Sequence, residues 1–325
     1  AFFEYSRALA KIGHEVHVIA AARPGEKTFE VVNKVAVQRT PVKTTRRLSP
    51  ENLRFSYLAR RALAAVIKMS TFDIVHIFSH AGSILIRFAN KKTRGTKWIY
   101  DIRSGPVRKS PWSFLGKAVQ GFESSFFDAT FVVDKGLMES KSSDKVFLAP
   151  IGVNLQMFRP VRSRWVLSKH DIPESDVVLV YSGSLDPERR TENLIYAFWE
   201  ASKVIKNLRL MVLGEGRNLG NLRSVAEKLA ISDKVLFLGY VDYGRMPAFL
   251  SAADIAVSYV PLVPAFDKQP PLKTIEYLAC SLPVIATETA GNRQFIAHEK
   301  NGLLTKDDPN SLSETIIRLS KDADL

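Results

Sequence analysis

Two periodicities of apolar residues alternate along the chain. Short runs of aliphatic and β-branched residues predict strands, and longer stretches with apolar residues at every third or fourth position predict helices. In the first half, strands are expected at Glu15–Ala20, Val31–Val37, Asp73–Phe78, Lys97–Asp101, Ala129–Val133 and Lys145–Ala149. Helices are expected at Phe2–Ile12, Leu53–Lys68, Ser83–Asn90 and Trp112–Phe126.

The second half repeats this alternation. Strands are expected at Val177–Ser182, Leu208–Leu213, Val235–Leu238, Ile255–Ser258, Pro283–Ala286 and Gly302–Leu304. Helices are expected at Thr191–Val204, Asn218–Leu229, Met246–Ala252, Leu272–Ser281 and Asn310–Ser320. Most of the strands are continuous Val, Ile and Leu runs, which are typical of parallel strands buried on both faces. The pattern therefore predicts an α/β fold built from doubly wound sheets.

One stretch, Ala149–Trp165, has neither period and is rich in Pro and Arg. We interpret it as the connection between two domains, which would span residues 1–150 and 151–325. A doubly wound domain normally begins with a strand and a tight loop that leads into its first helix. The chain instead opens inside the helix expected at Phe2–Ile12 and stops just after another helix, so we expect a fragment that is incomplete at both ends.

Composition and charge narrow the class of protein. With 46% hydrophobic and 24% charged residues, and no uninterrupted apolar run of membrane-spanning length, the sequence is typical of a soluble globular protein. Its single cysteine, Cys280, cannot form an internal disulfide, which fits a reducing compartment such as the cytoplasm. Residues 1–165 hold 28 Lys and Arg against 12 Asp and Glu (+16), whereas residues 166–325 hold 18 against 21 (−3). The basic half favours an anionic partner, namely lipid head groups, a phosphorylated acceptor or nucleic acid, or else it is a solvated basic surface.

The segment Pro270–Glu276 carries the strongest signature of a binding site. Pro271 suits the first position of a helix, because its missing N–H costs nothing there. Amides at a helix N-terminus can bind phosphate oxygens, and here they would belong to Leu272, Lys273 and Thr274. Lys273 adds a positive charge, and the Glu276 carboxylate could accept hydrogen bonds from the cis-diol of a ribose. The alternative is an ordinary helix start with a solvated Lys/Glu pair.

Two glycine-containing turns follow strands of the second half. In the first, Gly183–Thr191, the guanidinium groups of Arg189 and Arg190 suit a diphosphate, although a solvated pair at a helix start is the alternative. The second turn, Gly214-Glu215-Gly216, only partly matches a dinucleotide-binding fingerprint. Its next glycine is displaced, and the third strand ends in Gly239-Tyr240 rather than in an acid for the ribose.

Candidate residues of the first half lie where strands end, the edge at which open α/β sheets bind ligands. His80 follows one strand, whereas His76 within that strand is expected in the core. The next strand ends at Asp101, which could accept a hydrogen bond from a sugar hydroxyl, with Arg103 near an acceptor or a phosphate. The alternative is a loop-capping aspartate with a salt-bridged arginine.

From Pro270 to Thr287 the chain reads PPLKTIEYLACSLPVIAT. This stretch resembles the donor-binding signature of glycosyltransferase family 4, E-P-F-G-L-x-x-L-E-A-M-A-x-G-x-P-V-I-A. The resemblance implies the GT-B fold, with two Rossmann-like domains facing across a cleft. It also implies that Glu276 holds the ribose hydroxyls and that the amides of Leu272 and Lys273 meet the diphosphate. Lys268 replaces the family's first glutamate, which contacts the donor sugar, and P-P-L-K is similar to a subset with S-P-L-K.

Other segments resemble the same family. The turn that begins at Gly183 resembles G-R-L-x-x-E-K-G, whose basic residues clamp the donor diphosphate; its arginine, lysine and last glycine correspond to Ser184, Arg189 and Arg190. Gly214 and Gly216 match a G-x-G turn that faces the donor, and Gly239 matches a strand end that offers backbone groups to the base. Residues 149–160 match the interdomain hinge, and residues 301–304 match an N-G-L-L that follows the donor site.

The resemblance implies a retaining glycosyltransferase that moves a sugar from a UDP- or GDP-sugar to a glycan, lipid-linked or small-molecule acceptor. The domain at 151–325 would bind the donor and the domain at 1–150 the acceptor. The catalytic candidates are Asp101, His80 and Lys273, with no metal and no cofactor beyond the nucleotide sugar. A UDP-sugar epimerase or hydrolase on the same fold, or a non-catalytic module that binds a sugar nucleotide or a membrane, are the alternatives.

The expected partners are the nucleotide-sugar donor, the acceptor and an anionic membrane surface contacted through the basic first half; nucleic acid is not expected. We expect the protein in the cytoplasm, with peripheral attachment to the inner face of the membrane, in cell-envelope or polysaccharide biosynthesis.

Overall fold

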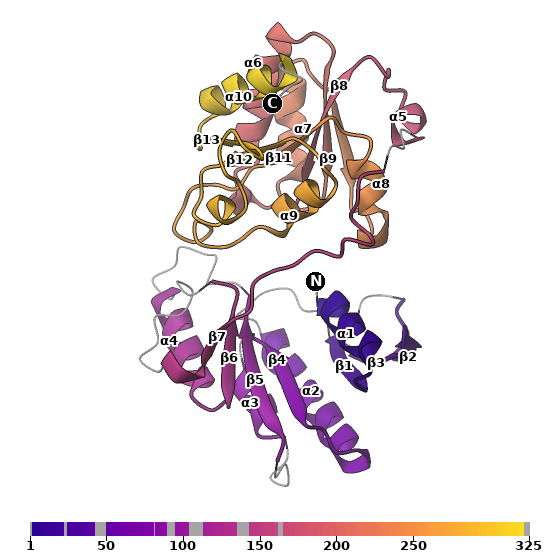
Figure 1. The fold of residues 1–325 in the computed structure, drawn as a ribbon, viewed down its shortest axis with the longest axis vertical. Coiled ribbons are helices and arrows are strands. Elements are labelled where there is room, and N and C mark those ends of the chain that lie inside the picture. Colours follow the sequence, from indigo (N-terminus) through magenta and orange to yellow (C-terminus); the bar gives the residue numbers. More distant parts are fainter. Residues whose placement is uncertain are drawn as a thin grey trace. The chain divides into compact units, whose positions relative to one another are not determined.

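The computed structural model of the chain describes residues 2–22, 25–42, 50–80, 82–89, 95–103, 113–134, 143–161 and 165–321. The chain folds as two compact units that meet in sequence between Pro150 and Ile151. We call them unit 1 and unit 2. Both combine helices with parallel strands, which confirms the α/β fold predicted from the alternating pattern (Figure 1).

The described residues of unit 2 form one parallel sheet. Its strands are β8 (Val177–Ser182), β9 (Leu208–Leu213), β10 (Val235–Gly239), β11 (Ile255–Ser258), β12 (Val284–Thr287) and β13 (Leu303–Thr305). They lie in the order β10-β9-β8-β11-β12-β13. The direction in which the chain adds strands therefore reverses between β8 and β11, and open α/β sheets bind ligands beyond the carboxyl ends of the strands at such a switch point.

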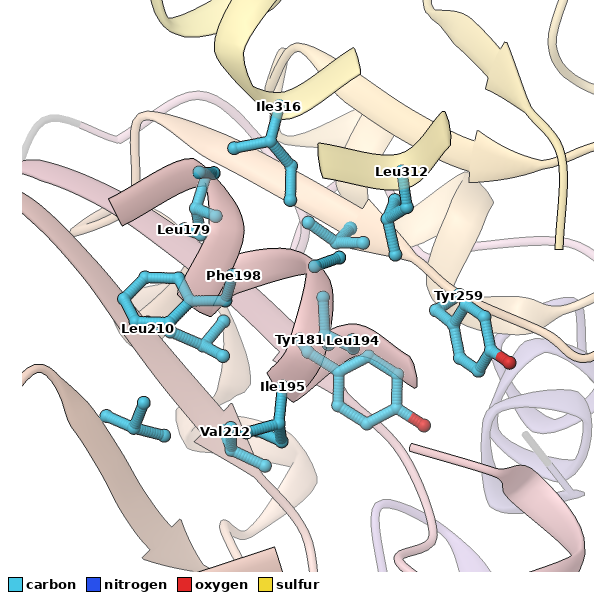
Figure 2. Close-up of a cluster of buried hydrophobic side chains, with 14 of the residues drawn as sticks. Leu179, Tyr181, Leu194, Ile195, Phe198, Leu210, Val212, Tyr259, Leu312 and Ile316 are labelled. Atoms are coloured by element: carbon cyan, nitrogen blue, oxygen red, sulfur yellow. The ribbon is translucent and has the colours of Figure 1, made fainter. Parts of the chain in front are cut away.

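Helices cover both faces of this sheet because successive strand residues point to opposite sides. One face packs against α6 (Glu192–Val204), α7 (Leu219–Lys228) and α10 (Pro309–Lys321), in a cluster that includes Leu179, Phe198 and Ile316 (Figure 2). The other face packs against α5 (Trp165–Lys169), α8 (Met246–Leu250) and α9 (Leu272–Ala279). The short turns η3, η4 and η5 lie at Pro187–Arg189, Tyr243–Arg245 and Asn292–Gln294.

Unit 1 contains two smaller sheets. The first has the order β1-β3-β2, and the second, parallel throughout, has the order β4-β5-β6-β7. The strands are β1 (Val16–Ala21), β2 (Phe29–Val32), β3 (Val35–Thr40), β4 (Ile74–Phe78), β5 (Lys97–Ile102), β6 (Ala129–Val132) and β7 (Val146–Leu148). The helical elements are α1 (Phe2–Lys11), α2 (Pro50–Met69), α3 (Ser83–Arg87), α4 (Ser113–Ser124) and the turn η2 (Ser143–Lys145).

The single strand predicted at Val31–Val37 is wrong. The chain reverses at Asn33 and Lys34, whose φ angles are 51° and 66°, and β2 and β3 pair as an antiparallel hairpin. Positive φ at both central residues is the geometry of the tight turn that matches the twist of two paired strands. Asparagine adopts this conformation more readily than most residues, so Asn33 was the available signal.

Candidate functional site

The switch point of unit 2 brings a lysine and an arginine together. Lys273, in the first turn of α9, donates from Nζ to the carbonyl oxygen of Tyr259 at 2.6 Å, and its Nζ lies 4.0 Å from the centroid of the Tyr181 ring. Arg189, on the turn after β8, lies with Cζ 4.1 Å from the centroid of the Phe266 ring. The hydroxyl groups of Tyr181 and Tyr259 point away from the aliphatic core (Figure 2). The ring of Tyr181 in β8 and the carbonyl of Tyr259, the residue after β11, therefore both contact Lys273.

Neither of these two cations is bonded to a carboxylate among the described residues. Burial lowers the pKa of Lys273 well below its usual value, and the charge of Arg189 lowers it further. Burial also lowers the pKa of Arg189, against the opposing effect of Asp186 and Glu188. An anion with two charges, such as a diphosphate, would stabilise both cations, because it restores the interactions that burial removes.

Glu276 lies one turn along α9 from Lys273 and is only 7% exposed. Burial raises the pKa of its carboxyl group, while a hydrogen bond from Tyr243 opposes that shift. No ion pair joins Glu276 to Lys273 in the part of the chain that the structure describes. The alternative of a solvated Lys/Glu pair at a helix start therefore does not describe this segment, since each residue is bonded to a different tyrosine.

Pro271 lies one position earlier than predicted. Helix α9 begins at Leu272, and Pro271 is the extended residue before it, with φ −85° and ψ 124°. The amide of Thr274 already donates to the carbonyl of Pro271 at 3.2 Å, and the Thr274 hydroxyl donates to Oδ1 of Asn292 at 2.8 Å. The amides of Leu272 and Lys273 have no acceptor among the described residues. Two amides of the helix start, rather than the predicted three, are available to a ligand.

The two predicted glycine turns pack against each other. A Cβ atom on Gly216 would lie 2.2 Å from the carbonyl carbon of Leu185, and one on Gly214 would overlap the backbone of Gly183. The Leu185 amide also donates to the carbonyl of Glu215 at 2.9 Å. The close approach of the loops after β8 and β9 therefore requires glycine at positions 214 and 216, a requirement independent of any ligand.

Charged and polar groups bind the same loops together. Arg217 lies with Nε 3.1 Å from Oδ1 of Asp186 and with Nη2 3.0 Å from Oε2 of Glu188. The Ser184 hydroxyl donates to the other oxygen of Asp186 at 2.8 Å. Both acids lie within three residues of Arg189 in sequence, and both pair with Arg217. The role of Arg217 could not be predicted from the sequence, because an arginine at the start of a helix is most often solvated.

The remaining residues predicted to bind the nucleotide-sugar donor are Arg190 and Gly239. Arg190 is exposed and adopts a left-handed conformation with φ 47°. Gly239 ends β10, and its carbonyl accepts from the amide of Gly214 at 2.8 Å. The loops after β8, β9 and β10 are therefore connected through backbone contacts.

In unit 1, Asp101 is fully buried at the end of β5. Its Oδ2 lies 2.8 Å from Nε2 of His76 and accepts from Nη2 of Arg103 at 2.7 Å. This is the alternative that the sequence left open, an aspartate with a salt-bridged arginine, so that Asp101 orients Arg103. A direct contact between Asp101 and a sugar stays a prediction.

His80 is held through both ring nitrogens. Nδ1 lies 2.9 Å from the carbonyl oxygen of Phe78, which can only accept, so Nδ1 carries the proton and Nε2 accepts from the Ser56 hydroxyl at 3.0 Å. Burial lowers the pKa of His80, which keeps the ring neutral at pH 7. His80 would have to exchange one of these partners to act in catalysis, and that role stays a prediction.

Over the described stretches of the chain, no group of three or more His, Cys, Asp or Glu side chains is arranged to hold a metal ion. Nor does any helix in those stretches have the length and apolar character needed to cross a membrane.

Two family models match the chain. The model "Glycosyltransferase Family 4" matches residues 2–140, and "Glycosyl transferases group 1" matches residues 166–325. The putative glycosyltransferase EpsD of Bacillus subtilis (strain 168) is 28% identical over 320 residues, which are 93% of this chain and 78% of that protein. The chain spans less than half the length of several other curated relatives that it matches.

Solved structures of lower identity share the fold. Sucrose-phosphate synthase from Thermosynechococcus elongatus matches with a TM-score of 0.77 at 21% identity, over 98% of this chain and 83% of that one. HepE of Anabaena, solved in complex with UDP and glucose, matches with a TM-score of 0.70 at 14% identity, over 89% of this chain and 78% of that one. Both likenesses assign the GT-B fold to the chain.

Proposed function

Because the chain belongs to family 4 of the glycosyltransferases, group 1, we propose that it transfers a sugar, with retention of configuration, from a UDP- or GDP-sugar. The acceptor would be a glycan, a lipid-linked sugar or a small molecule. The main support for the donor site is the pair Lys273 and Arg189 at the switch point of unit 2. Neither cation has a carboxylate partner among the described residues. Unit 2 would hold the donor and unit 1 the acceptor.

The proposed donor site has separate groups for the diphosphate and for the ribose of the nucleotide. Lys273 uses one of its three N–H groups in the hydrogen bond to the Tyr259 carbonyl, so the other two could donate to diphosphate oxygens. Arg189, whose Cζ lies over the Phe266 ring, would donate from its guanidinium group to the same oxygens. Glu276 would accept from the ribose hydroxyls in place of, or beside, its present bond to Tyr243.

Catalysis would rest on stabilising the leaving diphosphate. Negative charge develops on it as the sugar bond breaks, and Lys273, Arg189 and the positive end of the α9 dipole would stabilise that charge. The acceptor would attack from the face that the diphosphate leaves, and this proposal needs no cofactor or metal beyond the nucleotide sugar. Asp101 and His80 remain candidates on the acceptor side.

We propose a cytoplasmic location with peripheral attachment to the inner face of the membrane, in cell-envelope or polysaccharide biosynthesis. The uneven charge supports it, since residues 1–165 carry a balance of +16.

Calorimetric titration with UDP and GDP tests the donor site. HepE was solved with UDP, which makes UDP the first nucleotide to try. Glu276→Ala should weaken binding of the preferred nucleotide by about tenfold or more, because two hydrogen bonds to a charged acceptor are lost. Glu314→Ala, an exposed glutamate on α10, is the control and should bind as the wild type does. Equal affinity of Glu276→Ala and wild type would reject the ribose assignment.

Product analysis then separates transfer from the alternative reaction. A transferase consumes the UDP- or GDP-sugar in proportion to the acceptor supplied. An epimerase or hydrolase acting on the same donor would release or rearrange the sugar without any acceptor.

A further inference from the structure

Two polar side chains of helix α4 in unit 1, Gln120 and Glu123, point inward. Gln120 donates from Nε2 to the hydroxyl of Ser79 at 3.0 Å. Glu123 is only 3% exposed and accepts from the Tyr100 hydroxyl at 2.8 Å and from the Ile84 amide at 3.3 Å. The face of α4 that meets the sheet is therefore a hydrogen-bonded polar layer.

The opposite face of α4 is apolar and exposed. Val119 is 46% exposed, Phe122 is 62% exposed, and Phe126, just after the helix, is 37% exposed. Spacings of three and four residues place them on one side. The Phe126 ring lies 5.1 Å from that of Phe122 and 5.9 Å from that of Phe88, which is 54% exposed and follows α3. With Leu85 of α3, 38% exposed, these side chains form what we call the aromatic patch.

This arrangement is the reverse of an ordinary surface helix, which buries its apolar face and exposes its polar one. The Phe126 ring contacts those of Phe88 and Phe122, and all three rings are more than a third exposed, so they leave apolar area in water that a partner would remove. The inward hydrogen bonds of Gln120 and Glu123 fix the rotation of the helix, so the patch cannot turn inward without breaking them.

The charge around the patch selects the kind of partner. In sequence, α3 and α4 contain a single carboxylate, Glu123, and it is buried. Arg87 lies at the border, where its Nε donates to the carbonyl oxygen of Phe126 at 2.9 Å. The surrounding half of the sequence has the +16 balance. An apolar surface in a basic setting, with no exposed acid on its two helices, complements an anionic lipid layer.

We propose that the aromatic patch docks unit 1 on an anionic lipid bilayer. The rings of Phe88, Phe122 and Phe126 insert at the boundary of head groups and acyl chains, and the basic surface of unit 1 contacts the head groups. Hydrophobic insertion and charge act together, as stable peripheral attachment requires. Docking would bring the chain to a lipid-linked acceptor, and this link to the acceptor rests on the proposed function. Binding of the patch to the bilayer does not depend on that function.

Flotation with lipid vesicles, without nucleotide, tests the patch. The wild type should bind vesicles of equal parts phosphatidylglycerol and phosphatidylcholine far more strongly than vesicles of phosphatidylcholine alone. Replacing both rings, Phe122→Ser with Phe126→Ser, should weaken binding to the anionic vesicles by about tenfold or more. Tyr196→Ser removes a 40% exposed aromatic ring from α6 of unit 2 and should change nothing. The double variant should bind UDP as the wild type does, which distinguishes a failed patch from a failed donor site.

Three results would overturn the proposal. The first is a wild type that binds neither kind of vesicle, and the second is a folded double variant that binds as tightly as the wild type. The third is a wild-type dimer in solution that the double variant converts to a monomer, which would assign the patch to a second copy of the chain. If the double variant does not fold, Phe122→Trp replaces it. Its fluorescence should shift to the blue with anionic vesicles, and an unshifted spectrum rejects the proposal.

Discussion

A Cβ atom on Gly214 would lie 1.9 Å from the carbonyl oxygen of Gly183. The first residue of the loop after β9 thus touches the first residue of the loop after β8 with no room for a side chain. Since the amide of Gly214 also donates to the carbonyl of Gly239 at 2.8 Å, the loop after β10 is connected to the same point. Arg189 lies six residues beyond Gly183 on the loop after β8. Because the contact fixes the start of that loop, the position of Arg189 depends on it.

Gly214→Ala should destabilise unit 2. The added methyl group forces the two loops apart and requires a backbone with φ 145° to carry a side chain, so we expect a loss of about 1–3 kcal/mol in the free energy of unfolding. Urea denaturation measures it. The control is Gly220→Ala in α7, where a Cβ meets nothing within 4 Å and should stabilise the helix by about 0.5–1 kcal/mol. Equal midpoints for Gly214→Ala and wild type would contradict the contact.

Binding of a UDP-sugar should be coupled to protonation of Lys273. Burial and Arg189 lower the pKa of Lys273 in the free protein, and a bound diphosphate would raise it again. Between these two pKa values the complex holds one more proton than the free protein, so affinity should fall as pH rises, by at most about tenfold per pH unit. Calorimetry in buffers of different ionisation enthalpy measures this uptake. Lys273→Arg, which stays protonated, should bind without that pH dependence, and a wild type that takes up no proton would contradict the prediction.

Arg217 should support donor binding by neutralising two acids. In Arg217→Gln the negative charges of Asp186 and Glu188 are no longer neutralised by Arg217 and would repel a diphosphate, so we expect the Kd for the donor to rise by about threefold at low salt, and less at high salt. In a background of Asp186→Asn with Glu188→Gln, the same substitution should have no effect. A matching loss in that background would show that Arg217 acts in another way.

Tyr277→Phe should destabilise the end of β8. The Tyr277 hydroxyl accepts from the Ser182 amide at 2.7 Å and lies 2.9 Å from the Ser182 hydroxyl, and all of these groups are buried. Without the hydroxyl, the buried Ser182 amide loses this hydrogen-bond acceptor, so the expected loss is about 1–3 kcal/mol in the free energy of unfolding. Thermal denaturation checks it against Tyr196→Phe, which changes an exposed tyrosine. A melting temperature as high as that of the control would contradict the buried bond.

The sequence predicted the elements of unit 2 closely. Strands β8, β9 and β11 begin and end where their apolar runs do, because strands buried on both faces consist almost entirely of apolar residues. Arg209 within the run of β9 is the exception, and its side chain pairs with Asp176. The hairpin of β2 and β3 was missed because the two strands together look like one apolar run. Only the conformation of Asn33 and Lys34 divides them, and a lysine at such a position gives no sequence signal.

The donor candidates could be predicted only in part. Lys273 and Glu276 were identifiable from their spacing at a helix start, and both lie at the switch point. Tyr181 and Tyr259 were not, because aromatic residues at the ends of buried strands look like core residues. Their partners come from elements far away in sequence, and only the folded sheet brings those together. The reversed polarity of α4 was hidden for the same reason, since it depends on what Gln120 and Glu123 contact.

The two sheets of unit 1 have a consequence for handling the protein. Within the described residues, β1 and β4 each pair with a neighbour on one side only. Both are apolar, VHVIAA and IVHIF, and lack the charges or prolines that protect such edges. Their unpaired N–H and C=O groups offer backbone hydrogen bonds to a strand of another molecule. In concentrated solution this chain should therefore aggregate through backbone pairing. Substitutions in the aromatic patch of α4 should not prevent it.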